Sequence, residues 1–351
     1  MRKLIAALST AALLGLSPRP ALAAEELTAK QSGQVVDALI GDMDAYFNPD
    51  KAKAVQAALR AKRAELSRLH DRVALAEALS AITIAVSGDQ HLKVSVATTS
   101  AKAVDLTAAE QDLVDRHLAY GLMAVRRLPG NVGYMKLRYF ENTAPGVAMI
   151  DAAMGMLKDT TALIIDLREN TGGGGGADYR LLGHLSSTPL VLSELHWREA
   201  DGSVRVEKPQ ASVPAGGPLY VDKPVFVLTG PRTFSAAEAV AYDIQANRRG
   251  LLIGTRTRGG ANPSNRAAPP LGFGLTVVVP NGQAFQPLTG KTWDGAGLKP
   301  DVETPFEGAL TEAYRRALAE GKPLVSTPKS DKERADAIAD PAAALAADQK
   351  L

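Results

Sequence analysis

Ser235 lies where a serine can act as a helix cap or as a nucleophile. It stands in the run TFSAAE (233–238), between the apolar, strand-like run 224–229 and a helical pattern over 238–247. A strand, a tight turn and a helix would place the hydroxyl, and the first N–H groups of the helix, at the edge of a sheet. A nucleophile and an oxyanion donor are useful there. The spacing Ser-x-x-Glu is equally the capping box of an ordinary helix, so this run leaves both interpretations open.

The glycine run 172–176 is a second place where chemistry could occur. It follows an apolar, strand-like run over 161–167. A phosphate loop of the Walker type is excluded, because Ala177 and Asp178 stand where Gly-Lys-Ser/Thr would be needed. Glycines permit close approach and unusual backbone angles, so their bare N–H groups could face a substrate carbonyl. A flexible turn is the alternative.

A general base must come from the histidines. The chain has five, namely His70, His91, His117, His184 and His196. His91 differs from the rest, because it follows the turn 87–90 and opens a strand, which places it well to face a cleft. The others lie in helical or strand patterns where surface or core positions are expected. No pair has zinc-ligand spacing, so no metal site is predicted.

Asp294 is the candidate carboxylate. It lies between Trp293 and Gly295. Aspartate beside glycine is typical of a turn. A carboxylate that orients a catalytic histidine is the other interpretation.

The first residues read as an export signal. Residues 1–3 are positively charged, 4–16 form an apolar run too short to span a bilayer, and 21–23 read Ala-Leu-Ala. We therefore expect a signal peptide over 1–23 and a bacterial protein that is periplasmic or secreted. No later apolar run predicts a membrane span.

Composition excludes several classes of protein. The 351 residues include no cysteine, which rules out disulfides, thiolate zinc sites and a cysteine nucleophile. The net charge is only +2, and no basic patch is interleaved with aromatic residues, so a nucleic-acid partner is not expected.

Hydrophobic periodicity divides the mature chain into three parts. A helical pattern from Thr28 to Ile84 predicts a small bundle over 24–86. Strands then alternate with helices, which predicts an α/β core over 87–322. The Ala- and charge-rich tail, 323–351, is either a helix packed on the outside or a loose end. Further strands are predicted over 92–96, 131–137, 251–253 and 275–279, and helices over 108–118 and 144–158.

Five runs together resemble one family of serine peptidases. It comprises the tail-specific (C-terminal processing) proteases, the tricorn core protease and the repeats of interphotoreceptor retinoid-binding protein. The runs, in chain order, are 87–92 (SGDQHL), 166–173 (DLRENTGG), 233–238 (TFSAAE), 254–263 (GTRTRGGANP) and 293–301 (WDGAGLKPD). Each is weak alone, but five in the right order are specific.

The resemblance implies a crotonase-like (ββα spiral) core and an enzyme without a cofactor. It implies a peptide or unfolded-protein substrate, with Ser235 as nucleophile, His91 as base and Asp294 as the orienting acid. Oxyanion donors would be the N–H groups of Gly172 or Gly173 and of Ala236. Two residues near the serine, Phe234 and Arg258, are candidate substrate contacts, although a surface position is the equal alternative for the arginine.

Departures from the family narrow the mechanism. Gly259 and Gly260 occupy the place where tail-specific members keep a lysine, which implies Ser-His-acid rather than Ser-Lys chemistry. The gap between Val96 and Asn131 is too short for a PDZ insert. Asp294 replaces the family's glutamate, and Gln90 replaces a serine of tricorn. Gln90 and Glu238, the latter in the capping box, are secondary candidates for the catalytic site. The alternative function is a non-catalytic carrier of a retinoid or fatty acid; the oligomeric state is not predicted.

Overall fold

The computed structural model describes residues 26–96 and 106–348. The predicted signal peptide, 1–23, lies outside the described residues. Among those that are described, no helix is both long and apolar enough to cross a membrane.

Three helices form the N-terminal part, as predicted. They are α1 (Ala29–Asp42), α2 (Pro49–Leu66) and α3 (Arg72–Ser87). Each begins at a polar cap whose side-chain oxygen accepts from a backbone N–H of the first turn; the caps are Thr28, Asn48 and Asp71. Gly88, at φ 76°, ends α3 in the left-handed region that glycine favours.

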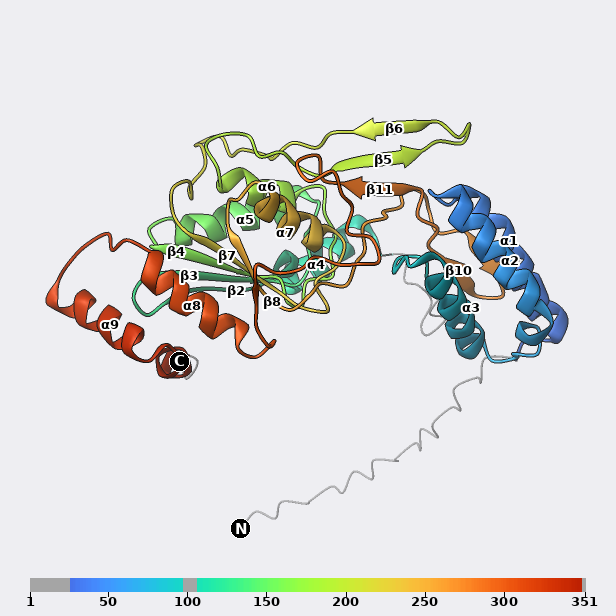
Figure 1. Cartoon of the computed structure of the whole chain (residues 1–351), viewed down its shortest axis with the longest axis horizontal. Coiled ribbons are helices and arrows are strands. Elements are labelled where there is room, and N and C mark those ends of the chain that lie inside the picture. Colours follow the sequence, from blue (N-terminus) through green and yellow to red (C-terminus); the bar gives the residue numbers. More distant parts are fainter. Residues whose placement is uncertain (1–25, 97–105, 349–351) are drawn as a thin grey trace, which may run out of the picture.

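Strands from distant parts of the chain complete this N-terminal unit. The strands β1 (Val94–Val96), β9 (Pro270–Gly272) and β10 (Leu275–Val277) form an antiparallel sheet in the order β1-β10-β9. Its apolar side chains join one buried cluster with those of α1, α2 and α3. Figure 1 shows β10 beside α3, at the end of the molecule away from α9. The chain therefore returns to the bundle after most of the core has been built.

A six-stranded sheet forms the centre of the core. Its order is β12-β8-β7-β4-β3-β2, and every neighbouring pair is parallel except β2–β3. The strands are β2 (Leu122–Leu128), β3 (Val132–Leu137), β4 (Ala162–Asp166), β7 (Val225–Thr229), β8 (Leu251–Gly254) and β12 (Val302–Glu303). All residues of β4 and β7 are buried, which explains their continuous apolar sequences. Because these two strands are parallel neighbours, the loops after them meet at one edge.

Helices cover both faces of this sheet, which confirms the predicted α/β layering. Side chains of α5 (Ala144–Leu157), α6 (Ala177–His184) and α7 (Ala236–Ala246) share a buried cluster with one face of β4 and β7. Those of α8 (Ala309–Glu320), α9 (Pro328–Ala339) and α10 (Pro341–Asp348) share another with the opposite face. A further helix, α4 (Ala108–His117), precedes β2.

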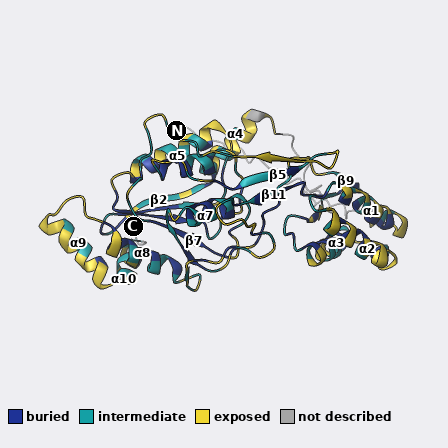
Figure 2. Ribbon diagram, turned by 45° about the horizontal axis from the view of Figure 1, so that its top comes forward, coloured by how far each residue is buried: buried dark blue, intermediate teal, exposed yellow. Residues whose placement is uncertain are grey.

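The tail is a pair of packed helices rather than a loose end. Arg334 of α9 donates to the carbonyl oxygen of Gly130 at 3.0 Å, and Ala337 and Leu345 are buried against the sheet. The outward side of α9 is exposed (Figure 2).

A third sheet is formed by three antiparallel strands. It has the order β11-β5-β6, with β5 (Glu194–Arg198), β6 (Val204–Glu207) and β11 (Gly282–Phe285). In Figure 1 the β5–β6 hairpin extends over the core toward the bundle. All four residues of β6 are exposed.

We predict that the returning strand stabilises the bundle. Leu275 is 1 % exposed within the N-terminal core, so Leu275→Ala should lower the free energy of unfolding by about 2–5 kcal/mol, as large-to-small core changes do. Urea denaturation followed by circular dichroism measures the change. Leu288→Ala, at a side chain that is 52 % exposed, is the matched control and should change stability by less than about 0.5 kcal/mol. Equal stability of the two variants would contradict the prediction.

Candidate active site

Ser235 occupies a strained turn between β7 and α7. Its backbone has φ 56° and ψ −125°, which a residue with a side chain rarely adopts, and α7 begins at the next residue. Such a conformation costs of order 1–3 kcal/mol and persists only where the surroundings impose it. Here the Phe234 N–H donates to the carbonyl of Asn170 at 3.0 Å and the Ser235 N–H donates to Glu238 Oε2 at 3.0 Å. Strain held in this way is common at functional sites.

The serine hydroxyl is not used as a helix cap. Glu238 makes its half of the predicted capping box, by accepting from the Ser235 N–H. The Glu238 N–H, however, donates to the backbone carbonyl of Ser235 at 2.8 Å, and the serine side chain makes no capping hydrogen bond. The hydroxyl is therefore left for a substrate.

Glu238 is fully buried and accepts from two segments of chain. Oε1 accepts from the Thr257 hydroxyl at 2.5 Å and the Gly259 N–H at 2.7 Å, and Oε2 accepts from the Gly260 N–H at 2.8 Å as well as from Ser235. Burial raises the pKa of this carboxyl, and the hydrogen bonds act in the opposite direction. Glu238 thus joins the serine turn to the loop 257–260. Each of its oxygens already accepts two hydrogen bonds, so neither is free to take part in a proton relay.

The glycine loop after β4 lies directly against Ser235. A Cβ atom on Gly172 would be 2.7 Å from the Ser235 Cβ, and one on Gly173 would be 2.1 Å from the carbonyl oxygen of Phe140. Both glycines have positive φ, at 105° and 99°. Only glycine fits either position, which is the structural reason for the glycine run.

Gly172 and Gly173 differ as oxyanion donors. The Gly172 N–H is buried and already donates to Asn170 Oδ1 at 2.9 Å. Gly173 is exposed, and within the described chain neither its N–H nor that of Ala236 donates to another group. The free donor pair beside the serine is therefore Gly173 with Ala236.

A buried ion pair supports this loop from below. Asp166, at the end of β4, accepts two hydrogen bonds from the Arg168 guanidinium, at 2.9 and 2.6 Å, and one from the Tyr134 hydroxyl at 2.8 Å. The Thr233 hydroxyl donates to the Leu167 carbonyl at 2.7 Å, which fixes the serine turn to the same base. The sequence motif contained these residues, but nothing in their spacing indicated the role.

His91 packs against the residue before the serine. Its ring lies 4.3 Å from the ring of Phe234, centroid to centroid. The Arg258 guanidinium lies 4.7 Å from the centre of the same Phe234 ring. Burial lowers the pKa of His91; the charge of Asp89 opposes this effect and that of Arg258 adds to it. Phe234, a predicted substrate contact, therefore holds the histidine ring, and Arg258 is exposed beside it.

Gly260 lies close to both Ser235 and His91. A Cβ atom on Gly260 would be 2.7 Å from His91 Cε1 and 2.0 Å from Phe234 Cε2, and Gly260 lines the same cavity as Ser235. No hydrogen bond joins Ser235 to His91 among the described residues, and His91 Nδ1 is buried without a partner. The hydrogen bond expected between the predicted nucleophile and the predicted base is therefore not made in this structure.

The carboxylate beside His91 is that of Asp89. Its Oδ1 lies 3.8 Å from His91 Nδ1 and accepts from the His91 backbone N–H at 2.8 Å. Its Oδ2 accepts from the Tyr46 hydroxyl and from the Asn262 amide, both at 2.9 Å. Asp89 is fully buried. Sequence reasoning passed over it as a turn residue, although its position two residues before the histidine was the available signal.

Asp294, the predicted orienting acid, lies in the same cluster but pairs elsewhere. Its Oδ2 lies 3.7 Å from Lys51 Nζ, and its side chain is 4 % exposed. Burial, with the nearby charge of Asp89, raises the pKa of Asp294 to about 6. No contact between Asp294 and His91 is found in the described part of the chain. Gln90 is half-buried, and its side chain makes no hydrogen bond to a described residue.

Two further observations concern the position of His184 and the grouping of possible metal ligands. His184 is 1 % exposed and its Nε2 lies 2.8 Å from Asp151 Oδ1, which confirms the core or edge position expected for it. Across the described ranges, no three His, Asp or Glu side chains are grouped so as to hold a metal ion.

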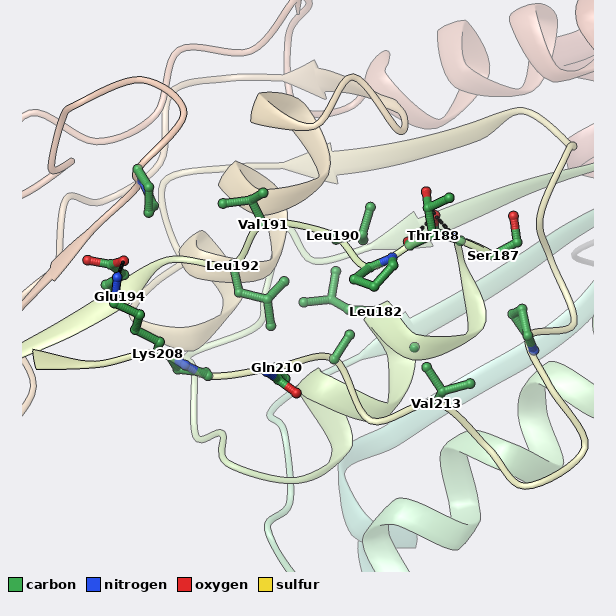
Figure 3. Close-up of a pocket in the computed structure, with 17 residues that line it drawn as sticks. Leu182, Ser187, Thr188, Leu190, Val191, Leu192, Glu194, Lys208, Gln210 and Val213 are labelled. Atoms are coloured by element: carbon green, nitrogen blue, oxygen red, sulfur yellow. Dashed lines mark hydrogen bonds and ion pairs between the residues drawn. The ribbon is translucent and has the colours of Figure 1, made fainter.

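Two cavities lie near this region of the core. One, of about 380 Å³, opens beside Ser235 and Ala236. A larger one, of about 460 Å³, lies between α6 and the start of β5 and contains neither Ser235 nor His91 (Figure 3). Its two charged side chains, Glu194 and Lys208, pair with each other at 2.9 Å. The smaller cavity is therefore the candidate substrate site.

Comparison with known proteins finds similarity to peptidases over about half of the chain. The sequence model of peptidase family S41 matches residues 131–304. The chloroplastic carboxyl-terminal-processing peptidase 1 of Arabidopsis thaliana is 27 % identical over 188 residues, which are 52 % of this chain and 36 % of the relative. A carboxyl-terminal-processing protease of Synechocystis is 32 % identical over 136 residues, 37 % of this chain and 29 % of the relative. The chain spans about a third of the length of these curated relatives.

Solved structures share the fold over more of the chain. A putative peptidase from Parabacteroides merdae has a TM-score of 0.58 at 18 % identity, covering 85 % of this chain and 99 % of that one. Tricorn protease has a TM-score of 0.51 at 14 % identity, covering 81 % of this chain and 35 % of that one. Residues 131–304, which contain Ser235 and every strand of the central sheet except β2, are therefore identified by the sequence match as a segment of peptidase family S41, and the solved structures share its fold.

Proposed function

We propose that this chain is an exported serine peptidase that hydrolyses peptide bonds through a Ser-His-acid mechanism. The observation that carries the proposal is the arrangement of Ser235. Its hydroxyl is released from capping, its backbone is held in a strained turn, and the unused N–H groups of Gly173 and Ala236 lie beside it. A nucleophile next to two unpaired donors is the arrangement that acyl transfer requires.

In this mechanism Ser235 Oγ attacks the scissile carbonyl while His91 takes its proton. The N–H groups of Gly173 and Ala236 then donate to the oxyanion of the tetrahedral intermediate. His91 returns the proton to the leaving amine, and water hydrolyses the acyl-enzyme by the same steps. The lowered pKa of His91 keeps the ring neutral, and so able to accept a proton, at pH 7.

We assign the positioning of His91 to Asp89 rather than to Asp294. The separation of 3.8 Å between Asp89 Oδ1 and His91 Nδ1 is longer than a hydrogen bond, and catalytic contacts are often longer before substrate binds. A small rotation of the imidazole would pair its unpartnered Nδ1 with this carboxylate. Asp294 then lies behind it and links the cluster to Lys51 of the bundle.

Three finer features belong to the same proposal. The signal-like segment 1–23 supports export to a bacterial periplasm or medium. The alternation of parallel strands and helices is consistent with a crotonase-like spiral. Peptides or unfolded proteins are the expected substrates. Carriage of a retinoid or fatty acid is less well supported, because acidic side chains line the cavity beside Ser235.

We predict that a fluorophosphonate probe labels Ser235. The mature chain should gain the mass of one probe, and Ser235→Ala should gain none and lose peptide hydrolysis by roughly 10⁶-fold in kcat. Intact-mass spectrometry and a fluorogenic peptide assay measure the two effects. Ser203→Ala, at an exposed turn serine, is the control and should label like the wild type. Equal labelling of the Ser235 variant, or none of the wild type, would count against the proposal.

We predict that Asp89 matters more to His91 than Asp294 does. Asp89→Asn should slow labelling at least tenfold, whereas Asp294→Asn should slow it less. The pH profile separates positioning from folding: the Asp89 charge raises the pKa of His91, so removing it should move the midpoint of labelling to lower pH. A larger loss in the Asp294 variant, with that midpoint unchanged in the Asp89 variant, would return the role to Asp294.

We predict that the charge of Arg258 helps to lower the pKa of His91. Because the pKa of His91 is lowered, the labelling rate of the wild type should fall to half below pH 6.5. The Arg258 charge contributes to that lowering, so Arg258→Gln should move the midpoint upward. Stopped-time labelling between pH 5 and 8 measures it, with Arg256→Gln, on the same loop, as the control. A midpoint that moves equally in both variants would contradict a specific effect of Arg258.

A further inference from the structure

The cavity beside Ser235 has apolar walls. One wall is formed by the serine turn and the glycine loop, with Ser235, Ala236 and Gly173. The remaining apolar lining comes from α6, α7, β5, β11 and the loop after β11, and includes Tyr179, Leu195, Ala239, Ala284 and Trp293. A volume of about 380 Å³ lies within the range of pockets that take one small ligand or side chain.

A carboxyl group in this lining has one oxygen without a partner. Asp243 of α7 is 3 % exposed, and it accepts from the Ser193 N–H, the Ser193 hydroxyl and the Gln286 amide at 2.9, 2.6 and 2.8 Å. Within the described chain all three of these bonds fall on Oδ1, and none falls on Oδ2. Asp243 lines the cavity, so Oδ2 is the oxygen of this carboxyl that is left for a ligand there.

Two further acids line the same cavity. Asp178, in the first turn of α6, is 4 % exposed, and Glu207, at the end of β6, lies at the rim. No lysine, arginine or histidine is found among the described lining residues. The larger cavity differs, because there Lys208 neutralises Glu194. Glu207 is paired with Arg205, whose Nη1 lies 3.5 Å from its Oε2, whereas the two buried acids, Asp243 and Asp178, have no cationic partner within the described chain.

We propose that this cavity is the specificity subsite for the residue that contributes the scissile carbonyl, and that it takes a lysine or arginine side chain. The aliphatic stem would pack on the apolar walls, as such stems do. The cation would meet Asp243 Oδ2 and Asp178. This inference rests on the proposed function, because it requires a substrate carbonyl at Ser235.

The charge states of the acids fit this assignment. Burial raises the pKa of Asp243 to about 7 and raises that of Asp178 as well. A bound cation favours the ionised carboxylate and so would lower both pKa values again. Other titratable groups that face this position are Tyr179 of α6 and Glu207 of β6. Recognition of a cation should therefore weaken as the pH falls below 7.

The test compares two substrates that differ only in the cation. They are Ac-Ala-Ala-Lys- and Ac-Ala-Ala-norleucine-aminomethylcoumarin, since norleucine keeps the stem and lacks the amine. For the wild type at pH 8 we expect kcat/KM to be at least tenfold higher with lysine. In Asp243→Asn this ratio should fall at least fivefold, with fluorophosphonate labelling of Ser235 retained. Asp201→Asn, which removes an equal charge from an exposed turn, should keep the wild-type ratio.

A second measurement needs no substitution in the core. The lysine-to-norleucine ratio of the wild type should decrease from pH 8 to pH 6, and His91 does not affect it because both substrates use the same base. A wild type that labels at Ser235 but cleaves the norleucine substrate as well as the lysine one at every pH would overturn this inference alone. Absence of labelling would overturn the proposed function with it.

Discussion

The candidate site depends on one buried carboxylate, that of Glu238. Four donors from two segments converge on its two oxygens, and they include the backbone N–H of the serine itself. This convergence compensates the burial of a charge, which would otherwise be costly. It also holds Ser235 in a backbone conformation that serine does not prefer. Strain at the serine and satisfaction of the glutamate are therefore two aspects of the same interaction.

The parallel sheet brings the remaining parts together. Because β4 and β7 are neighbours running in one direction, the glycine loop and the serine turn emerge side by side. The proposed base, His91, lies instead on a short segment between α3 and β1. Its environment includes Tyr46 and Lys51 of the bundle. The proposed nucleophile and its proposed oxyanion donors thus belong to the core, whereas His91 belongs to the N-terminal unit. Their approach is set by how the two units pack.

Much of this could be predicted from local sequence. The capped helices, the fully apolar strands β4 and β7 and the glycine loop each carry their signal within a few residues. For Ser235 the local run left a cap and a nucleophile both open, and the five motifs taken together favoured a nucleophile. What lay beyond prediction was long-range pairing. The return of β9 and β10 to the bundle joins residues more than 170 positions apart, and no local pattern indicates it.

The acid cluster illustrates the same limit. Asp89 and Asp294 are each plausible turn residues, and only the fold reveals that they face one another while Lys51 binds one of them. Similarly, Gly172 and Gly173 are equivalent in sequence. Their difference as donors arises from Asn170, whose amide oxygen occupies one N–H and leaves the other free. Which of two similar residues is a free donor or the acid beside the histidine therefore depends on their hydrogen-bond partners, which the sequence spacing does not specify.

The returning strands also bear on modularity. The segment recognised as family S41 begins at residue 131, after His91, and it contains β9 and β10, whose apolar side chains belong to the bundle. A fragment cut at that boundary would keep Ser235, lose His91 and expose the apolar side chains of β9 and β10. The boundary of the sequence match and the boundary between the packed units therefore lie at different places in this chain. The stretch that sequence comparison identifies as a unit is not one that could be separated and still work.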